Sequence, residues 1–460
     1  MSKKVVIVGA GPGGYVCALR AARLGLDVTL VDRRWLGGVC LNVGCIPTKA
    51  LLASAEALLT ARSGREYGFT VAGEVAPDFP AMMSRKDKVV KRLTGGVGSL
   101  LRASGVKVVM GEATVRSGRE VSVCARDGES TIKCDAVVLA TGSEPARPKL
   151  FPIDERCVLT SDGILSLCKL PASLIVVGGG YIGMEFASLF SDLGSKVTVV
   201  EMLPRILAAS DEEVSKAVSD SLSRRGIEIM TGTKVDSVDV SDSGVSVSAG
   251  GKRLQADAML VAVGRVPNSG GLAGLGVTVG DGGFVKVDDG METGVPGLYA
   301  IGDLVGGALL AHKASAEGMV AAERIAGMDS KIDYRVLPSG VFTRPEAASV
   351  GLTEEQAAAQ GYSVKVGRFP FAACGKAVAA GHPEGFVKLL MDADTEEILG
   401  CHIFGHGATE LVAEAAIAMS AEALAESVAR TIHAHPTLPE ALMEAAHDAL
   451  GGALHLPKKG

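Results

Sequence analysis

Two cysteines, Cys40 and Cys45, are separated by four residues in the segment GGVCLNVGCIPTKALL, which spans residues 37–52. Such a pair can bind a metal, form a structural disulfide or form a redox-active disulfide. A zinc site usually needs further short-spaced ligands, but there is no second close cysteine pair, and all but one of the histidines follow residue 380. A cytosolic chain also disfavours a structural bridge. The pattern therefore favours a redox-active pair and no metal.

The spacing of the two cysteines restricts the backbone between them. On a straight helix, residues five apart are separated by a rise of about 7.5 Å, which exceeds the roughly 7 Å limit for a disulfide. Gly44 can supply a bend, and we expect the helix proper to begin near Pro47. Cys45 then lies at a helix N-terminus with Lys49 one turn further on, and both features favour a thiolate.

The segment HAHPTLPE supplies a second candidate group in His433, His435 and Glu440. Thiol–disulfide exchange needs a base, and imidazole suits that role near neutral pH. A carboxylate bonded to the other ring nitrogen would fix the tautomer. We therefore predict His435 as the base and Glu440 as its partner, although such residues taken alone are usual in surface loops. We also expect a cis His435–Pro436 peptide bond, because a tight turn must aim the imidazole.

Two similar segments can position this chemistry. KVVIVGAGPGGYVCALRAARLGLDVTLVD and SLIVVGGGYIGMEFASLFSDLGSKVTVVE each read as strand, G-x-G-x-x-G turn, helix, strand and acidic residue. In such a βαβ unit, free N–H groups at the helix start bind a pyrophosphate, and the terminal acid accepts ribose hydroxyls. Asp32 and Glu201 are those acids. Two dinucleotide sites follow, and Glu201 favours NAD over NADP because it would repel a 2′-phosphate, although Arg205 lies nearby.

Further strands complete the two nucleotide folds. An apolar strand that ends in a Thr-Gly turn is predicted for DAVVLATGSEPARP, and a similar strand is predicted after the second unit for DAMLVAVGRVPN. GLYAIGDLVGGALLAHKASAEGMVAAERI predicts a strand, a loop with Asp303 and a helix. Beyond residue 340 the glycine fingerprints disappear and an Ala-rich helix is expected at 407–429. The predicted fold is α/β, with two Rossmann-like dinucleotide-binding domains and a C-terminal α+β domain.

Composition limits the class of protein. The chain has 460 residues, is 47% hydrophobic and carries a net charge of −6. Length and composition predict about three globular domains. The negative charge, without a visible basic stripe, argues against a nucleic-acid partner.

Targeting signals and the other cysteines give the remaining expectations. No apolar run reaches the ~18 residues of a membrane span. The apolar N-terminal run is too short for a signal peptide. We expect a cytoplasmic bacterial protein, with a mature organellar protein as the alternative, and we expect the other seven cysteines to be buried core thiols.

Four motifs in this order, GGVCLNVGCIPTK, GGGYIGMEFA, AIGDL and HAHPTLPE, resemble those of the dihydrolipoamide dehydrogenases. These enzymes belong to class I of the pyridine nucleotide–disulfide oxidoreductases, and the similarity covers essentially the whole chain. The resemblance implies FAD in the first unit, NAD in the second and a Cys40–Cys45 redox disulfide. It places Cys40 toward the substrate and Cys45 toward the flavin. Dihydrolipoamide would reduce the disulfide while His435 accepts protons, and electrons would pass through FAD to NAD⁺.

The resemblance also implies further site residues and an assembly. Lys49 would lie at the flavin, and Glu185 would lie near the junction of flavin and nicotinamide. The family is a homodimer, with His435 delivered from the opposite subunit. A lipoyl-bearing acyltransferase or glycine-cleavage carrier protein would supply the substrate. The implied domains are 1–149 (FAD, first part), 150–270 (NAD), 271–340 (central, completing the FAD site) and 341–460 (interface).

Motifs and resemblance together predict two cofactor sites. The FAD site consists of Gly9, Gly11, Gly14, Asp32, Gly38, Lys49, Gly111, Thr141, Gly142, Ser143, Asp303, Leu310, Ala311 and His312. The NAD site consists of Gly178, Gly180, Tyr181, Ile182, Gly183, Glu185, Glu201 and Gly264.

Related enzymes are the competing interpretations. Glutathione reductase would place arginines where Glu201 stands and would need a peptide pocket. Mercuric reductase and the large thioredoxin reductases would add a C-terminal cysteine pair, whereas this chain ends LHLPKKG. A non-catalytic flavoprotein subunit is a further alternative, which the presence of Cys40, Cys45, His435 and Glu440 disfavours. No role is assigned to Cys374 or Cys401.

Overall fold

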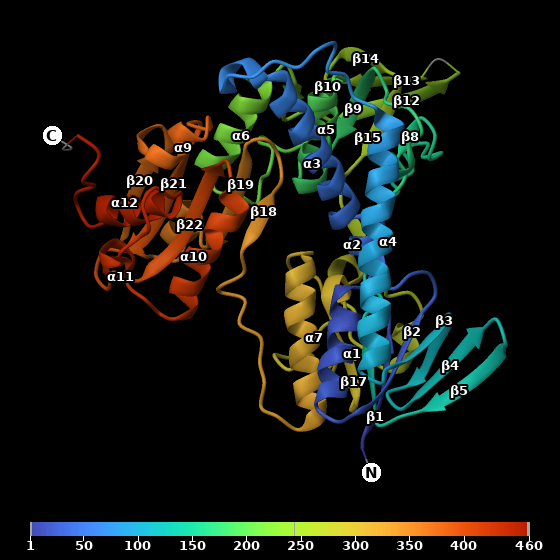
Figure 1. The fold of residues 1–460 in the computed structure, drawn as a ribbon. Helices are drawn as coiled ribbons and strands as arrows, with labels where there is room; N and C mark the ends of the chain where they lie inside the picture. Colours follow the sequence, from blue (N-terminus) through green and yellow to red (C-terminus); the bar gives the residue numbers. More distant parts are fainter. Residues whose placement is uncertain (1, 243, 458–460) are drawn as a thin grey trace. The chain divides into compact units, whose positions relative to one another are not determined.

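The computed structural model describes residues 2–242 and 244–457, which form two compact units (Figure 1). The first unit comprises Met1–Arg147, Ser161–Lys169 and Gly264–Asp333, and the second comprises Pro148–Thr160, Leu170–Val263 and Tyr334–Gly460. The chain passes from one unit to the other after residues 147, 263 and 333, among other places, and these three positions lie close to the predicted boundaries after residues 149, 270 and 340. The second nucleotide fold and the C-terminal domain share one compact unit, and the division into four domains stays a prediction.

A seven-stranded sheet with the order β17-β6-β1-β2-β3-β4-β5 organises the first unit. Its strands are β1 (Lys4–Val8), β2 (Asp27–Asp32), β3 (Lys107–Ser117), β4 (Glu120–Ala125), β5 (Gly128–Lys133), β6 (Ala136–Leu139) and β17 (Leu298–Ala300). The β17-β6-β1-β2-β3 part is parallel, and β3 continues into an antiparallel meander with β4 and β5. The Val- and Ile-rich β1 is buried on both faces, as expected for a central parallel strand.

The described part of this unit also contains helices. They are α1 (Pro12–Arg23), α2 (Gly38–Val43), α3 (Cys45–Arg62), α4 (Phe79–Ala103) and α7 (Ala311–Ala326). The 3₁₀ turns are η1 (Gly64–Tyr67), η2 (Ile164–Ser166), η3 (Ala273–Leu275), η4 (Asp281–Gly283) and η5 (Gly302–Val305). Strands β7 (Ser143–Pro145) and β16 (Arg265–Pro267) form a small antiparallel ribbon. Helices α1 and α7 cross closely: a Cβ on Gly318 would lie 2.4 Å from the Gly13 carbonyl oxygen. This contact packs α7 directly against the helix that follows the first glycine turn.

The second unit repeats the parallel arrangement. Its sheet has the order β11-β10-β9-β15-β8, formed by β8 (Val158–Leu159), β9 (Ser173–Val177), β10 (Lys196–Val200), β11 (Glu228–Met230) and β15 (Ala258–Val261). Helices α5 (Tyr181–Leu193) and α6 (Glu212–Arg224) pack on it, and β12 (Val235–Ser241), β13 (Gly244–Ala249) and β14 (Lys252–Ala256) form a meander. Both predicted βαβ units are therefore present.

The C-terminal part is an antiparallel sheet covered by helices, which confirms the predicted α+β domain. The sheet order is β18-β19-β22-β21-β20, with β18 (Ser339–Val341), β19 (Glu346–Gly351), β20 (Val364–Pro370), β21 (Gly385–Asp392) and β22 (Ile398–Gly405). The helices are α8 (Glu354–Ala359), α9 (Gly375–Ala379), α10 (Ala408–Ser420), α11 (Ala425–Arg430) and α12 (Pro439–Ala449), with η6 (Phe371–Ala373). The single helix predicted at 407–429 is wrong, because the chain turns between α10 and α11 and Glu422 adopts a positive φ of 54°.

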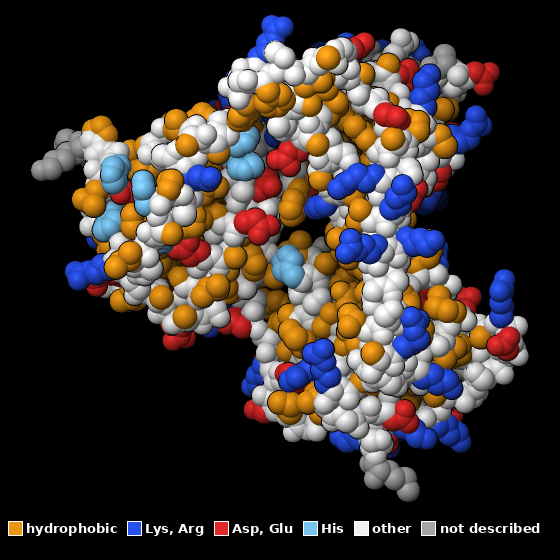
Figure 2. All heavy atoms as spheres, viewed as in Figure 1, with side chains coloured by type: hydrophobic (Ala, Val, Ile, Leu, Met, Phe, Trp, Pro, Cys, Tyr) orange, Lys and Arg blue, Asp and Glu red, His pale blue; other side chains and the backbone are white. Residues whose placement is uncertain are grey.

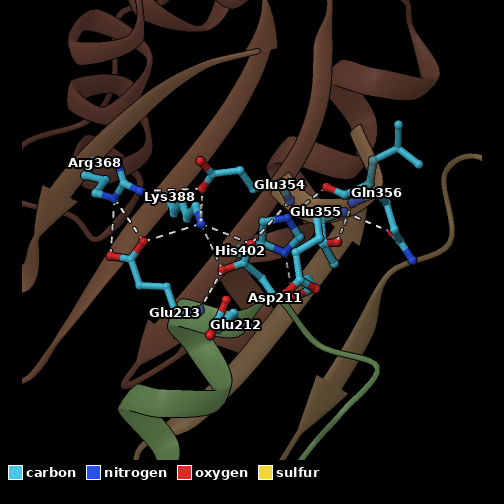
Figure 3. A network of polar contacts seen from close by, with 12 residues as sticks. Asp211, Glu212, Glu213, Glu354, Glu355, Gln356, Arg368, Lys388 and His402 are labelled. Atoms are coloured by element: carbon cyan, nitrogen blue, oxygen red, sulfur yellow. Dashed lines mark hydrogen bonds and ion pairs between the residues drawn. The ribbon is translucent and has the colours of Figure 1, made fainter. Parts of the chain in front are cut away.

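A buried lysine ties the second nucleotide fold to the C-terminal sheet (Figure 3). Lys388 on β21 lies 3.0 Å from Asp211 and 2.7 Å from Glu354. Asp211 also caps α6 by accepting the Glu213 N–H, and Glu354 lies in the first turn of α8. Burial alone would lower the pKa of Lys388, but its bonds to Glu354 and Asp211 outweigh burial and raise it. The lysine is therefore a charged link between the two parts of this unit.

One stretch, Gly38–Arg62, is long and apolar enough to pass a length-and-composition test for a membrane span, with 33% of its most apolar window buried. That test is weak evidence, because core helices of soluble proteins also pass it. The stretch is broken at Gly44, and its buried residues include Leu41, Leu51 and Leu58. The expectation of no membrane span stays a prediction.

The surface differs from the sequence interpretation at α4. Figure 2 shows Lys and Arg side chains along this helix, and Arg85, Lys88, Lys91 and Arg92 are exposed there. The interpretation that the chain lacks a basic stripe is therefore wrong for this helix. The sequence did not show this basic stripe clearly, because Val89 and Val90 interrupt the run of charged residues.

Candidate active site

The first glycine turn has the shape of a dinucleotide-binding turn. Gly9 has a φ of 106°, and a Cβ on Gly14 would lie only 1.8 Å from the Gly9 carbonyl oxygen. A Cβ on Gly11, by contrast, would meet no atom within 4 Å. The backbone at Gly11 is thus open at the start of α1, where free N–H groups can bind a pyrophosphate. This geometry fits the diphosphate of FAD.

The acid at the end of β2 is held in place by backbone donors. One carboxylate oxygen of Asp32 accepts the Ala10 N–H at 2.6 Å, and the other accepts the N–H groups of Arg34 and Trp35. Asp32 pairs with Met110 on β3, so that the predicted Gly111 follows directly at the same edge. The carboxylate keeps lone pairs for ribose hydroxyls.

The other predicted FAD residues gather at the carboxyl edge of the same sheet. Ser143, which follows β6, donates to Asp303 at 2.5 Å, and Arg265 donates to Ser143 at 2.7 Å. Thr141 donates to the Asn268 carbonyl oxygen at 3.0 Å. Because β6, β1 and β17 are parallel neighbours, these loops and the first glycine turn share one end of the sheet.

Helix α7 is locked to the Asp303 loop by a buried ion pair. Lys313 and Glu317 lie 2.9 Å apart with exposed side-chain fractions of 4% and 0%. Glu317 accepts the Gly302 N–H at 2.7 Å. The predicted residues Leu310, Ala311 and His312 lie at the N-terminus of this helix, beside that loop.

The cysteine pair lies where α2 and α3 meet. Gly44 between them has φ −146° and ψ −116°, so the predicted bend at Gly44 is confirmed. Helix α3 begins at Cys45 rather than near Pro47. Proline is tolerated there because the N–H groups of a first helical turn have no partner in the helix. The first regular bond runs from the Thr48 N–H to the Gly44 carbonyl oxygen at 3.2 Å.

The same segment packs against the first glycine turn. A Cβ on Gly38 would lie 2.5 Å from the Gly11 Cα, and the Gly37 N–H donates to the Ala10 carbonyl oxygen at 2.8 Å. The cysteines and the proposed pyrophosphate turn are thus parts of one packed structure. This contact explains why Gly37 and Gly38 precede the cysteine segment.

The two sulfurs are thiols in the structure and interact with each other. A hydrogen bond to Cys45 is the main cause, and burial the second, of a raised pKa for Cys40, while Lys49 lowers it. The side chains of Cys40 and Cys45 are therefore close enough to interact, and Lys49 is close enough to act on Cys40.

The second glycine turn repeats the first. Gly178 has a φ of 108°, a Cβ on Gly183 would lie 2.0 Å from the Gly178 carbonyl oxygen, and a Cβ on Gly180 would meet nothing within 4 Å. Glu201 accepts the Gly179 N–H at 2.5 Å and the Leu203 N–H at 2.6 Å. This turn, followed by Tyr181 and Ile182 on α5, fits a second dinucleotide.

The nearest arginine is engaged elsewhere. Both terminal nitrogens of Arg205 lie 2.9 Å from the carboxylate of Glu355, whose hydrogen bond raises the pKa of Arg205. Arg205 is therefore held away from a 2′-phosphate role, which agrees with the NAD preference. Glu185 accepts the Phe342 N–H at 3.1 Å, and Gly264 begins the last segment of the first unit. The cofactor roles of Glu185 and Gly264 stay predictions.

The predicted histidine–glutamate pair is formed. His435 Nδ1 lies 2.9 Å from Glu440 Oε1, and the other carboxylate oxygen accepts the Thr437 N–H at 2.7 Å. Burial alone would raise the pKa of Glu440, but the bonds from His435 and Thr437 outweigh it and lower the pKa. The ionised carboxylate can only accept, so Nδ1 carries hydrogen and Nε2 is the basic nitrogen. The predicted cis His435–Pro436 bond is confirmed.

Helix α12 carries an acidic stripe that the sequence analysis missed. Glu440, Glu444 and Asp448 lie four residues apart on one face. Glu444 accepts the Leu454 N–H and His455 Nδ1–H, and Asp448 accepts the Arg368 N–H at 2.9 Å. The four-residue spacing was the visible signal: each carboxylate fixes a different segment beside the helix that holds Glu440.

The other cysteines divide into two groups. Cys17, Cys134, Cys374 and Cys401 are buried as expected, and burial raises the pKa of Cys17 to about 12. Cys124 and Cys168 are exposed and Cys157 is half-buried, so the expectation of core thiols is wrong for them. Cys124 points to the face of β4 opposite that of the buried Val123, because successive side chains of a strand point to opposite faces. Among residues 2–242 and 244–457, no group of three or more His, Cys, Asp or Glu is arranged to hold a metal.

Comparisons with known proteins agree with this geometry. Residues 3–318 match the family model described as pyridine nucleotide-disulphide oxidoreductase, and residues 337–446 match its dimerisation domain. The dihydrolipoyl dehydrogenase of Geobacillus stearothermophilus is 43% identical, with 99% of this chain and 98% of the relative covered. That of Chlorobaculum tepidum is 45% identical, with 97% of each chain covered.

Solved structures show the same similarity in three dimensions. LpdA from Mycobacterium tuberculosis superposes with a TM-score of 0.91 at 29% identity, covering 97% of this chain and 99% of the other. The flavoprotein disulfide reductase RclA from Escherichia coli gives a TM-score of 0.85 at 28% identity, covering 95% and 98%. The resemblance and the predicted fold class are confirmed, and the dimerisation domain supports a homodimer. The chain belongs to the pyridine nucleotide-disulphide oxidoreductases, an FAD- and NAD(H)-dependent enzyme family.

Proposed function

We propose that this chain is a dihydrolipoyl dehydrogenase, which oxidises protein-bound dihydrolipoamide and reduces NAD⁺. The observation that carries the proposal is the cysteine pair at the α2–α3 break, packed through Gly38 against the open turn at Gly11. A redox pair in that position belongs to the flavin site rather than to a separate structural bridge. The names of the relatives at 42–45% identity support the choice of substrate.

The first unit would hold FAD, and the second would hold NAD. In the first, the turn from Gly9 to Gly14 would bind the pyrophosphate, Asp32 a ribose, and the Ser143–Asp303 pair a hydroxyl-bearing part of the cofactor. In the second, the turn after β9 and Glu201 would do the same for NAD. When bound, FAD supplies two-electron chemistry between a dithiol and a nicotinamide. Lys49 would place its positive charge beside the flavin.

The cysteines would perform the exchange in two steps. A substrate thiolate attacks the Cys40 sulfur of the oxidised pair, which forms a mixed disulfide and releases Cys45 as a thiolate. The second substrate thiolate then attacks the substrate sulfur of that mixed disulfide. Lipoamide leaves as the cyclic disulfide, Cys40 is released, and the substrate's electron pair stays with the two cysteines.

His435 would accept the protons that the substrate thiols lose. Its ring is 78% exposed, so Nε2 can meet a thiol that arrives from outside. Glu440 holds Nδ1 and stabilises the imidazolium that forms. We propose that His435 serves the cysteine pair of the partner subunit in a homodimer, and that the exposed apolar residues Ile417 on α10 and Ile432 are covered in that homodimer.

The partner, location and domain roles complete the proposal. The lipoyl group would be carried by an acyltransferase or a glycine-cleavage carrier protein, and the enzyme would work in the cytoplasm of a bacterium. Glu185 would lie near the junction of flavin and nicotinamide, with Gly264 at the NAD site. Residues 341–460 would form the dimer interface.

The test is a rate comparison on the purified holoenzyme. NADH oxidation with lipoamide is measured beside NADPH oxidation with oxidised glutathione. Fast turnover only with the first pair supports the proposal. Fast turnover only with the second would contradict both the assignment of Glu201 and the substrate, and slow turnover with both, despite a flavin spectrum, would contradict the substrate alone.

A further inference from the structure

Helix α4 differs in charge from the rest of the chain. It contains six Lys or Arg residues and one acidic residue, whereas the whole chain carries a net charge of −6. At 3.6 residues per turn, the basic stripe of Arg85, Lys88, Lys91 and Arg92 falls on one face of the helix, opposite the buried Lys86. The stripe is exposed along that face (Figure 2).

Three residues of the stripe are not neutralised by an ion pair. Among residues 2–242 and 244–457, the side chains of Lys88, Lys91 and Arg92 enter no salt bridge. The single acid of the helix, Asp87, lies 2.9 Å from Lys86 on the buried side. Lys and Arg side chains are positively charged near neutral pH, so this face presents uncompensated positive charge to the solvent.

The helices packed against α4 do not supply the missing negative charge. Helices α1 and α2 contain no acidic residue, and α3 contains only Glu56. Glu56 lies about 9 Å along α3 beyond Ala50, in the direction away from Cys45. The positive potential of the stripe therefore extends over the part of α3 that begins at the cysteine pair.

Two contacts place the stripe along the cysteine segment. Near the start of α4, Arg85 Nη1 donates to the Ala50 carbonyl oxygen at 2.8 Å. Further on, a Cβ on Gly98 would lie 3.3 Å from Leu36 Cδ1. The rest of the stripe lies between these contacts on α4, and both cysteines lie between Leu36 and Ala50 in the chain. Helix α4 thus runs antiparallel to the segment that carries the cysteines (Figure 1).

The helix rise gives the level of the stripe. The rise from Arg85 to Arg92 is about 10.5 Å, and the rise from Ala50 back to Cys45 is about 7.5 Å. Because Arg85 contacts Ala50 and the two helices are antiparallel, Arg92 lies at nearly the level of Cys45. Positive charge is therefore concentrated beside the redox pair rather than at a remote end of the unit.

This location limits the kind of partner that fits the stripe. A protein that carries a lipoyl group must bring its disulfide to Cys40 and Cys45, so the body of that protein meets the surface around them. An acidic face on the carrier would match the stripe, and the negative net charge of the chain would repel the same face elsewhere. Attraction at one place and repulsion at others orient an encounter.

We propose that the basic stripe on α4 is the docking surface for an acidic face of the lipoyl-bearing carrier protein, which it orients beside the cysteine pair. The inference rests on the proposed function and adds the charge of the partner and the surface that receives it. Such a contact acts mainly on the rate of association and weakens as salt rises. Free lipoamide, which is small and neutral, does not need the surface.

The first test uses the wild-type holoenzyme and lipoyl-lysine peptides of equal length, one flanked by glutamates and the other by glutamines. We measure kcat/KM for NADH oxidation with each peptide. We expect roughly a tenfold preference for the acidic peptide at low ionic strength, and none in about 1 M salt, where the Debye length is about 3 Å. Equal rates at low ionic strength would overturn the proposal, as would the preference for the neutral peptide that the net charge alone predicts.

A triple variant assigns the preference to the stripe. Lys88→Gln, Lys91→Gln and Arg92→Gln together remove three charges and keep flexible polar side chains. Its flavin spectrum reports whether it folds and binds the cofactor. We expect the variant to lose the preference for the acidic peptide, while kcat/KM for free lipoamide stays within about twofold. A preference that persists in the folded variant would overturn the proposal.

The matched control has the same change in net charge at another place. It replaces Arg119, Arg126 and Lys133 by glutamine, which are exposed basic residues of the meander formed by β3, β4 and β5. We expect this control to keep the preference for the acidic peptide. An equal loss in the control would show that net charge rather than the stripe is responsible, and would overturn the proposal.

Two further measurements address other occupants of the stripe. If the stripe variant changes from dimer to monomer in sedimentation, the stripe belongs to a subunit interface and the proposal fails. Inhibition of peptide reduction by duplex DNA but not by polyglutamate would indicate a nucleic-acid surface and would also overturn it. If the wild type fails to reduce free lipoamide, the proposed function fails. If it reduces free lipoamide but does not distinguish the peptides, only the docking surface fails.

Discussion

The two dinucleotide turns have nearly the same backbone conformation but differ in the side chains that pack around them. Gly9 and Gly178 have φ values of 106° and 108°. Between the first two glycines of the motif, however, the first turn has Ala10 and the second has Gly179. A Cβ on Gly179 would lie 2.9 Å from Ile206 Cγ2 and 3.1 Å from Glu201 Cγ.

In each unit, the acid and the loop that follows it compensate for the residue between the first two glycines. In the first, the methyl of Ala10 is accommodated because the acid is the shorter Asp32 and the following loop residue is Gly37, which donates to the Ala10 carbonyl oxygen. In the second, Leu207 makes the matching bond to Gly179 at 2.8 Å, and Ile206 fills the space that a methyl would take. The two turns thus share one backbone shape, while the acid and the following loop vary together.

Among changes to the two turns, the largest expected effect comes from the third glycine of each turn. In Gly14→Ala and Gly183→Ala the new Cβ would overlap a backbone oxygen, and relieving that overlap costs about 3 kcal/mol or roughly a hundredfold in affinity. Gly14→Ala should lose FAD, and Gly183→Ala should keep FAD but raise KM for NADH. Flavin absorbance per chain and NADH kinetics measure the two. Loss of flavin in Gly183→Ala would show that the two turns are not independent.

A smaller expected effect tests whether Ile206 compensates for the missing side chain at Gly179. Gly179→Ala should raise KM for NADH roughly tenfold, the equivalent of about 1.4 kcal/mol. Ile206→Leu removes the Cγ2 methyl at constant volume, and in the double variant it should recover most of the loss. Ala10→Gly in the first unit, the reciprocal change, should retain FAD. Strictly additive effects of Gly179→Ala and Ile206→Leu on KM would refute the proposed coupling.

Much of this architecture could be predicted from the sequence because its signals are local. The glycine spacing, the acid after β2 or β10 and the bend at Gly44 each follow from residues within one supersecondary unit. The break between α10 and α11 was missed, because alanine favours helix on both sides and only the tertiary packing selects the turn. The role of Lys388 was invisible, because its partner Asp211 lies far away in the sequence.

The smallest predicted effect is a difference between the two units in how their stability depends on pH. Burial lowers the pKa of His402, which lies beside the Lys388–Asp211 link of the second unit, with Nδ1 2.9 Å from the Ser349 hydroxyl and Nε2 2.9 Å from the Leu352 carbonyl oxygen. A histidine with a lowered folded-state pKa contributes stability that is complete above its unfolded value of about 6.5 and is lost as pH falls through the folded pKa. The corresponding buried link of the first unit is the Lys313–Glu317 ion pair, which contains no histidine.

Thermal unfolding between pH 7 and pH 5 measures this difference. The only tryptophan, Trp35, lies in the first unit, so its fluorescence follows that unit while far-UV circular dichroism follows the whole chain. Acidification should lower the dichroism transition by a few degrees more than the tryptophan transition. His402→Gln should reduce that gap. Equal shifts of both signals in the wild type would contradict the assignment.

The central claim is that electrons reach lipoamide only through the Cys40–Cys45 pair, and Cys40→Ser tests it most directly. NADH oxidation by lipoamide and by an artificial acceptor that takes electrons from the flavin are measured side by side on FAD-loaded protein. We predict that the lipoamide rate falls at least about a thousandfold while NADH still reduces the flavin. Retention of the lipoamide rate in Cys40→Ser would contradict the account.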